Sequence, residues 1–284
     1  MSDARAVEYR LARRIGGRGF SPHQFHEALR GVALGGDHVF AVGDSALKVF
    51  DTEGNLRGKW ATAFPGECVA VDGESRLWVG ERQQVEIFHP TNGLVDTWRD
   101  PERLGRVTAI GFGKGDLFLA DATARCIRRY DAQRRFLNDI GDRHRKGGFD
   151  IPNGVVDFAV DGEGFVHVAN PGMHRVERYS AEGALLGHFG RFDGRDPSGF
   201  GGCCNPTNLT VDSRGRVIVS EKAAPRVKVY DPAGELLTVV ADAAFDAGAR
   251  NMDLAVDSMG RIYVVDTATL QICVFSPAAP QVTA

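Results

Sequence analysis

The chain lacks any apolar run of the roughly 18 residues that a membrane-spanning helix needs. Its start, Met-Ser-Asp-Ala-Arg-Ala-Val-Glu-Tyr-Arg, has no apolar core, so no signal peptide is indicated. The twin arginine Arg13-Arg14 is followed by Ile-Gly-Gly rather than by an apolar stretch. These absences predict a cytoplasmic protein with no membrane partner, although a chain with a trimmed export signal would look the same.

Cysteine is scarce, because the chain of 284 residues holds five, and only Cys203 and Cys204 are close in sequence. A small secreted scaffold held together by disulfides would be denser in cysteine, so that class is excluded. The chain also has no Gly-x-Ser-x-Gly motif, no phosphate-binding glycine loop and no Cys-x-x-Cys pair. The absence of these signatures favours a protein that is not an enzyme.

Neither sign of charge dominates, since 34 basic and 37 acidic residues give a formal net charge of −3. This balance argues against general polyanion binding by the whole surface. A local basic run lies between residues 125 and 146 and includes Arg143, Arg145 and Lys146. No aromatic series accompanies it, so a solvated outer strand is favoured over a nucleic-acid site.

The chain is rich in glycine, with 35 residues, which suits many short strands joined by tight turns. Six segments share one layout, in which an apolar run, a glycine turn and an alternating strand precede a third strand that ends on an aromatic residue. These aromatic residues recur about 40 to 50 positions apart. They are Phe50, Phe88, Tyr130, Tyr179, Tyr230 and Phe275.

The fourth segment shows why a repeat predicts four strands. Asp161-Gly162-Glu163-Gly164 is a hairpin turn between two strand patterns, with glycine available for a positive φ. Further strands are expected over 175–179 and 184–189. Four strands at this period are typical of a propeller blade. One helix is also expected, from Ser21 to about Leu29, because Ser21 and Gln24 form a capping-box pattern.

The last segment supplies only three strands, and we predict that residues 9–15 add the fourth and so close the ring. The sequence thus predicts an all-β fold, a six-bladed β-propeller in one domain over 1–284 that is a monomer on its own. The expected blades are about 31–62, 66–100, 106–143, 155–191, 206–242 and 251–276 plus 9–15, followed by a flexible tail over 277–284.

The repeat resembles that of the NHL family, roughly Pro-x-x-Val-Ala-Val-Asp-x-x-Gly-x-Val-Tyr-Val-Ala-Asp-x-x-x-x-Arg-Val-x-Val-Tyr. Residues 206–230 and 156–179 fit it closely, and the resemblance, which covers almost the whole chain, implies a six-bladed propeller. Cys203-Cys204-Asn205-Pro206 with Ser220-Glu221-Lys222 is similar to one bacterial branch of that family, for which we expect Cys-x-Cys-Cys-Asn-Pro. Gly201 stands at the first cysteine position, so a three-thiolate site is incomplete here.

Strand direction puts the inter-blade loops, and the loops from second to third strands, on one face, called here the top face. The two longest inter-blade loops, 143–154 and 192–206, flank the fourth blade there, and long loops on a rigid scaffold tend to carry sites. Binding is therefore expected on the top face around blades three to five. The candidate residues are Cys203, Cys204, Asn205, Asn170, His174, Arg175, Glu221, Lys222, Arg226, Asp121, Arg143 and Arg145.

In the NHL pattern the polar residue that ends each second strand partners the arginine of the third strand. The resemblance implies the pairs Asn170 with Arg175 and Glu221 with Arg226, which would be structural. In the third blade Cys126 takes the place of the arginine. Asp121 is then left without its usual partner and becomes a candidate functional carboxylate.

Alignment of the repeats places Asp157, Asn208 and Asp253 near the upper ends of the channel-lining strands. Three oxygen-bearing residues could coordinate Ca²⁺ or a similar hard cation, and a water-filled polar lining is the alternative. The set is similar to the cation site of calcium-dependent lactonase propellers. The aligned positions hold no histidine, unlike the zinc-binding channel of peptide-amidating lyase propellers.

Adjacent cysteines have three interpretations. Cys203 and Cys204 are buried apolar thiols, a strained vicinal disulfide, or thiolate ligands for a soft metal such as Cu(I) or Zn²⁺. Two adjacent thiols rarely complete a tetrahedral site without further ligands, and Cys68 and Cys126 are the contributors to consider.

We expect a non-catalytic binding or scaffold propeller whose ligand is a partner protein or a small anionic molecule, and not nucleic acid. Two alternatives stay open. One is a metal- or redox-handling accessory protein acting through Cys203 and Cys204. The other is a cation-dependent lactonase- or lyase-like enzyme at the mouth of the channel. The sequence identifies no cofactor beyond Ca²⁺ in the channel or a soft metal at the cysteine pair.

Overall fold

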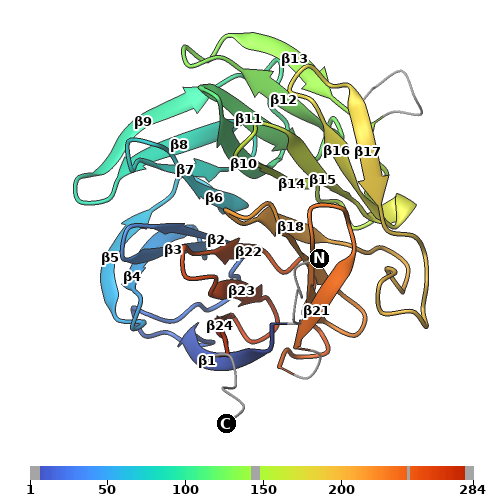
Figure 1. Cartoon of the computed structure of the whole chain (residues 1–284). Helices are drawn as coiled ribbons and strands as arrows, with labels where there is room; N and C mark the ends of the chain where they lie inside the picture. Colours follow the sequence, from blue (N-terminus) through green and yellow to red (C-terminus); the bar gives the residue numbers. More distant parts are fainter. Residues whose placement is uncertain (1–6, 142–147, 242–243, 279–284) are drawn as a thin grey trace.

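The computed structural model of the chain describes residues 7–141, 148–241 and 244–278. Its strands form six four-stranded antiparallel sheets, whose innermost strands surround a common centre (Figure 1). Each sheet is one blade, and within blades one to five the strands follow the chain from the centre outward. The predicted all-β, six-bladed propeller is therefore confirmed.

The blades have closely similar strand lengths. Blades one to three are built from β2 Gly31–Gly35, β3 His38–Gly43, β4 Ala46–Asp51 and β5 Leu56–Ala61, then β6 Cys68–Val71, β7 Leu77–Gly80, β8 Gln84–His89 and β9 Gly93–Arg99, then β10 Val107–Gly113, β11 Asp116–Asp121, β12 Cys126–Tyr130 and β13 Phe136–Ile140. Blades four to six are built from β14 Asp157–Val160, β15 Val166–Asn170, β16 Arg175–Tyr179 and β17 Leu185–Phe189, then β18 Asn208–Val211, β19 Val217–Glu221, β20 Arg226–Tyr230 and β21 Leu236–Ala241, then β22 Leu254–Val256, β23 Ile262–Asp266, β24 Gln271–Pro277 and β1 Tyr9–Gly16.

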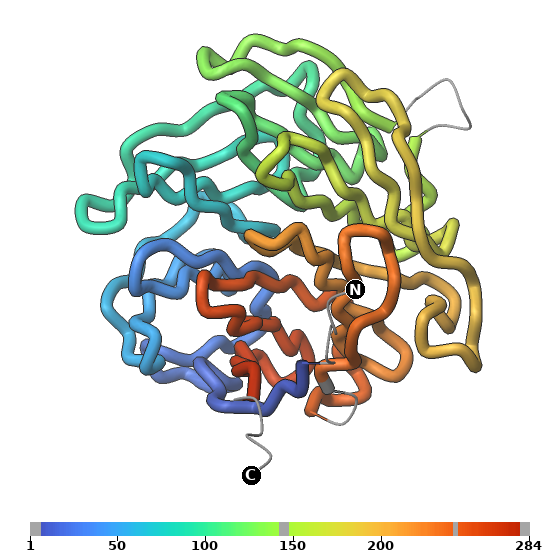
Figure 2. The backbone as a smooth tube through the Cα atoms, in the orientation of Figure 1, coloured from blue at the N-terminus to red at the C-terminus, as the bar shows by residue number. Residues whose placement is uncertain are grey.

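The two ends of the chain meet in blade six, as predicted. β1 pairs antiparallel with β24, with Tyr9 opposite Pro277 and Gly16 opposite Gln271. Figure 2 shows this N-terminal segment in blue beside the C-terminal strands in red. β24 reaches two residues beyond the predicted strand end, and most of the expected tail, 279–284, lies outside the described residues.

The hairpin turn predicted after the first strand of blade four is present. Asp161 Oδ1 accepts the backbone N–H groups of Glu163 and Phe165 at 3.0 and 2.9 Å, and Gly164 adopts φ +91°. A side chain that caps its own turn fixes the reversal locally, and the glycine relieves the strain of positive φ. The same aspartate-led turn occurs at Asp212 and Asp257.

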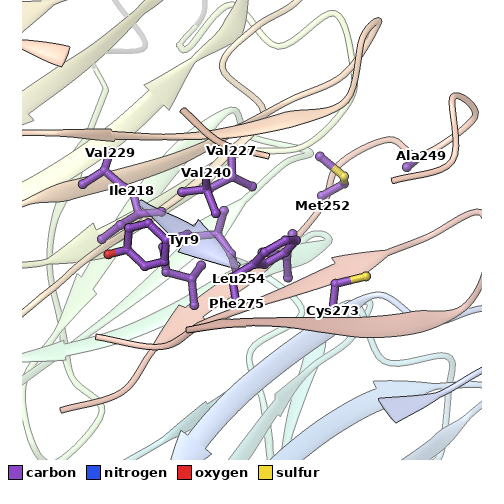
Figure 3. Packing of buried hydrophobic residues seen from close by; sticks show 12 residues of the cluster. Tyr9, Ile218, Val227, Val229, Val240, Ala249, Met252, Leu254, Cys273 and Phe275 are labelled. Carbon is purple, nitrogen blue, oxygen red and sulfur yellow. The ribbon is translucent and has the colours of Figure 1, made fainter. Parts of the chain in front are cut away.

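The hydrophobic core is divided into clusters, one between each pair of neighbouring blades. Between blades five and six, Ile218 and Val229 pack against Leu254 and Phe275, and Tyr9 of β1 joins them (Figure 3). Every blade is thus held on both sides by buried apolar contacts. Such a ring is a rigid support for the loops of the top face.

The helix predicted from Ser21 to about Leu29 is wrong, and among the described residues the helical structure is a single 3₁₀ turn, η1 Pro171–Met173. The capping contact does form, since the Ser21 N–H donates to Gln24 Oε1 at 3.2 Å. The helix does not continue because the next N–H groups bond to distant partners. Glu27 and Ala28 each donate to Asp44 Oδ1 at 2.8 Å, which ties the segment to blade one.

Candidate functional site

The central channel is hollow, and its mouth opens on the top face as a cavity of ≈ 240 Å³. A deeper cavity of ≈ 310 Å³, lined by the first strands of all six blades, shares Thr108 and Asp253 with it. The residues of the mouth that matter below are Arg30, Glu67, Thr108, Asn208, Arg250 and Asp253. Two of them, Asn208 and Asp253, belong to the predicted channel set.

The upper ends of the innermost strands form a ring in which each blade contacts the next. Cys68 Sγ donates to Val107 O at 3.6 Å, and Thr108 Oγ1 donates to Val156 O at 2.7 Å. At the first step of the ring, a Cβ added to Gly31 would lie 3.0 Å from Cys68 Cα, so glycine permits the close approach of blades one and two. Gly31, Cys68 and Thr108, near the upper ends of their innermost strands, therefore serve contact between neighbouring blades.

The two aspartates of the predicted cation site belong to the same ring. Asp157 Oδ2 accepts the backbone N–H of Leu209 in blade five at 2.7 Å. Asp253 Oδ2 accepts that of Val32 in blade one at 2.8 Å, and its Oδ1 accepts that of Leu254 at 2.9 Å. A hard cation would have to compete with these N–H donors for the same oxygens.

Asn208 is where this ring is interrupted. Its amide hydrogen-bonds Asp157, while its buried Oδ1 has no partner in the described part of the chain. The contact from blade five to blade six is made instead by Ser220, whose Oγ donates to Met252 O at 2.8 Å. Asn208 therefore carries an unsatisfied buried acceptor and is also one of the residues that line the cavity.

Burial raises the pKa values of both carboxyl groups, Asp157 and Asp253. Burial, and next the charge of Asp253, raises the pKa of Asp157 well above its usual value. Burial raises the pKa of Asp253 to about 7. Because two like charges in one desolvated site oppose each other, the pair takes up protons more readily than surface carboxylates do.

Cys203 and Cys204 lie in the loop that enters blade five, with their Sγ atoms 3.2 Å apart. Cys203 is exposed and Cys204 is buried. Cys68 lies in β6 of blade two and Cys126 in β12 of blade three, so neither shares the loop with the pair. Within 7–141, 148–241 and 244–278 no group of three or more His, Cys, Asp or Glu residues is placed to hold a metal ion.

Asn205 fixes the shape of the loop that carries the cysteine pair. Its Nδ2 donates to the backbone oxygens of Gly201 and Lys222 at 2.7 and 2.9 Å, and its Oδ1 accepts the Lys222 N–H at 2.9 Å. The loop is thereby tied to the connection between β19 and β20. The structure thus brings four of the predicted residues together, Cys203, Cys204, Asn205 and Lys222.

Glu221 bonds Arg226, as the resemblance implied, but a third residue completes the group. Lys228 is fully buried, and its Nζ lies 3.0 Å from Glu221 Oε2 and donates to Gly199 O at 2.6 Å. Sequence analysis missed Lys228, although a lysine inside the apolar pattern Arg-Val-Lys-Val-Tyr is a usable signal. The group holds the long loop 192–206 against blade five.

Two other predictions about pairs between second-strand and third-strand residues are wrong. Asp121 does have an arginine partner, Arg128, at 3.1 Å, and it accepts the backbone N–H of Thr123 at 2.9 Å. Arg175 bonds Glu177, with Nε donating at 2.7 Å, rather than Asn170. Residues two apart on a strand point to the same face. Arg128 can therefore reach Asp121 although position 126, where the arginine was expected, holds a cysteine.

The top of blade four carries unsatisfied polar atoms. Asn170 Oδ1 and His174 Nδ1 are both buried and have no hydrogen-bond partner within the residues that the structure describes. His174 ends η1 with φ 53°, and its ring lies 4.9 Å from that of Phe192. Arg143 and Arg145, the other candidates near this blade, lie outside the described residues.

The comparisons with known proteins agree with the fold. No protein-family model matches the chain. Protein brain tumor of Drosophila melanogaster is 28% identical over 125 residues, which is 44% of this chain and only 11% of that protein. In the described part of the chain, no helix is long and apolar enough to cross a membrane.

Three solved structures are similar over nearly the whole chain. Virginiamycin B lyase from Staphylococcus aureus has a TM-score of 0.66 at 9% identity, with 95% of this chain and 100% of that chain covered. A protein of unknown function from Bacteroides thetaiotaomicron has a TM-score of 0.66 at 14% identity, with coverages of 95% and 76%. A streptogramin B lyase structure has a TM-score of 0.64 at 10% identity, with coverages of 98% and 100%. At these identities the likeness concerns the fold alone, and the chain is a six-bladed β-propeller.

Proposed function

We propose that this chain is a binding propeller, whose ligand enters the cavity at the mouth of the channel and extends over the top face of blades three to five. Support comes from one observation above all: Asn208 lines the cavity, and its buried Oδ1 has no hydrogen-bond partner among the described residues. A buried acceptor left without a donor costs free energy, and a ligand that donates a hydrogen bond would recover it.

The charged side chains that line the mouth are Glu27, Arg30, Glu67, Arg250 and Asp253, and the two arginines support a small anionic ligand. Arg30 and Arg250 both line the cavity, and Arg30 is paired with Glu67 at 3.2 Å. The backbone of Arg250 is anchored, since its N–H donates to Thr267 Oγ1 at 2.9 Å. The raised pKa values of Asp157 and Asp253 mean that this pair carries less negative charge than two exposed carboxylates would.

The size of the cavity supports a ligand smaller than a typical drug. At ≈ 240 Å³ it falls just under the range of about 300–1,000 Å³ that is usual for drug-sized ligands. A compact carboxylate or phosphate compound that also carries a hydrogen-bond donor meets these requirements.

We further propose that the chain acts as a cytoplasmic monomer and that a protein partner can contact the loops around the occupied mouth.

Calorimetric titration with citrate, inorganic phosphate and a set of hydroxy-acids and amino acids tests the proposal. At least one compound should bind, and Arg250→Ala should weaken its binding by about tenfold or more, as loss of a hydrogen bond to a charged group predicts. Arg214→Ala is the matched control, because it removes an equal charge from an exposed turn residue that does not line the mouth. Equal weakening by both variants, or no binding by any compound, would overturn the proposal.

A further inference from the structure

The two adjacent thiols differ in a way that suits sequential chemistry. Cys203 is exposed, whereas Cys204 is 6% exposed and lies with its Sγ 3.2 Å from that of Cys203. An attacking thiol must be reached by its substrate, and a resolving thiol needs only to reach the first sulfur. One sulfur of the pair meets the first requirement and the other meets the second.

We propose that Cys203 and Cys204 are a thiol–disulfide exchange pair, in which exposed Cys203 attacks a small-molecule disulfide and buried Cys204 then closes a reversible vicinal disulfide. This activity goes beyond ligand binding at the channel mouth. The proposed binding function does not use the Cys203-Cys204 motif. Thiol–disulfide exchange gives this motif a chemical role of its own.

The surroundings of the pair favour a thiolate at the exposed position. The hydrogen bond from Cys204, and next the charge of Lys222, lowers the pKa of Cys203, with a smaller effect from Arg250. Burial raises the pKa of Cys204. The thiolate is the nucleophile in disulfide exchange, so the exposed sulfur is the one prepared to attack first.

The same surroundings argue against a resident metal ion. The positive charges of Lys222 and Arg250 act on Cys203 and would repel a cation. The described residues supply no third ligand to the pair. An electrophilic disulfide, especially one with anionic substituents, meets no such repulsion.

The reaction balances without any further reagent. The Cys203 thiolate attacks one sulfur of R–S–S–R, which forms a Cys203–S–S–R bond and releases RS⁻. Cys204 then loses its proton to solvent and attacks Cys203 Sγ, which forms the Cys203–Cys204 disulfide and releases the second RS⁻. The protein loses two electrons and two protons, and one small disulfide is reduced to two thiols.

Reversibility follows from the spacing of adjacent residues. Neighbouring Cα atoms lie about 3.8 Å apart across a trans peptide, whereas disulfide-linked Cα atoms usually lie about 4.4–6.8 Å apart. A disulfide between Cys203 and Cys204 is therefore strained, and strain makes a disulfide easier to reduce. A dithiol reductant should return the pair quickly to its thiol form.

Native full-length protein treated with 5,5′-dithiobis(2-nitrobenzoate) tests this mechanism, with released thionitrobenzoate and intact mass measured together. Wild type should release two thionitrobenzoates, retain no adduct and lose the mass of two hydrogens, and dithiothreitol should reverse the change. Cys204→Ser should release one thionitrobenzoate and keep one adduct on Cys203. Cys203→Ser should react at least about tenfold more slowly, because its remaining thiols are buried.

Two controls make the result decisive. Denatured wild type should titrate as five thiols, which shows that the other three are protected by folding. Thermal melts should show that both serine variants remain folded at the assay temperature. A stable adduct on wild type, or a Cys203→Ser variant that reacts as fast as wild type, would overturn the exchange mechanism.

Discussion

At the scale of single residues, the channel aspartates couple inter-blade contact to protonation. Asp253 accepts the N–H groups of Val32 and Leu254, and burial raises its pKa to about 7. Its folded pKa lies above the ordinary value of 3.8, so the folded state binds the proton more tightly than the unfolded chain. The stability that this proton contributes is fully present below pH 3.8 and is lost as the pH rises through about 7.

This coupling predicts a pH-dependent effect of Asp253→Asn. The variant has one side-chain acceptor where wild type has two, so it should be less stable than wild type at pH 5. The difference should shrink by pH 8, because wild type must then hold a buried charge that the variant lacks. Melting temperatures at pH 5, 6, 7 and 8 at constant ionic strength measure it.

Leu254→Ala is the control for this prediction, because it destabilises the adjacent buried position without adding or removing a titratable group. Its difference from wild type should stay constant over the same pH range. If the Asp253→Asn difference is equally constant, the raised pKa of Asp253 is not what sets the stability of the channel ring.

The residues of the candidate site were only partly predictable from the sequence. The alignment of repeats placed Asp157, Asn208 and Asp253 at equivalent positions, since equivalent repeats give equivalent places in the blades. It could not show that both aspartates accept backbone N–H groups from the next blade, because any residue except proline offers the same donor. Only the packed ring reveals that Asn208 is the member with an unused acceptor.

At the scale of elements, strands were easier to predict than irregular segments. Period-two alternation and aspartate-glycine turns are local signals, so the hairpins followed directly from the sequence. The helix predicted from Ser21 to Leu29 is wrong although its capping contact forms. Asp44 accepts the backbone N–H groups of Glu27 and Ala28, which a helix would have used for its own hydrogen bonds. A tertiary partner that is distant in sequence decided the conformation there.

The loop 192–206 depends on β20 through Lys228, which predicts a large effect of Lys228→Met. The substitution removes the bond from Nζ to Gly199 O and leaves Glu221 buried with Arg226 as its remaining cation. Because Arg226 still pairs with Glu221, the expected cost is that of a lost hydrogen bond to a charged group, about 1.5–3 kcal/mol of unfolding free energy. Urea denaturation measures the loss.

A double variant separates the lost ion pair from lost packing. Adding Glu221→Gln to Lys228→Met removes the buried carboxylate that has lost one of its two cations, so it should restore part of the unfolding free energy. A single Lys228→Met variant within about 0.5 kcal/mol of wild type, the range of ordinary surface substitutions, would show that the pair does not hold the loop.

At the scale of the whole molecule, the fold is a closed ring whose last contact uses both ends of the chain. Blade six takes three strands from residues 254–277 and its outermost strand from β1. Tyr9 packs in the cluster between blades five and six, and Ile15 packs in the cluster between blades six and one. β1 therefore stabilises two interfaces as well as its own sheet.

Deleting residues 1–17 should consequently destabilise the whole propeller and not only its last blade. The loss combines the ladder of β1 with β24, the burial of Tyr9 and Ile15, and the newly exposed edge of β24. Together these are expected to exceed about 5 kcal/mol, which is comparable to the total stability of many domains. Circular dichroism melts should show a broad, early transition.

A chain that begins at residue 7 is the matched control, since it keeps all of β1, and it should melt close to the full chain. A synthetic peptide of residues 7–17 should partly restore the transition of the truncated protein by pairing with β24, because the rest of blade six supplies the complementary edge and the two apolar pockets. Restoration by the peptide would separate the loss of this particular strand from general damage to the chain. A truncated protein that melts cooperatively at the wild-type temperature would mean that the packing between the blades, and not the shared blade, keeps the ring closed.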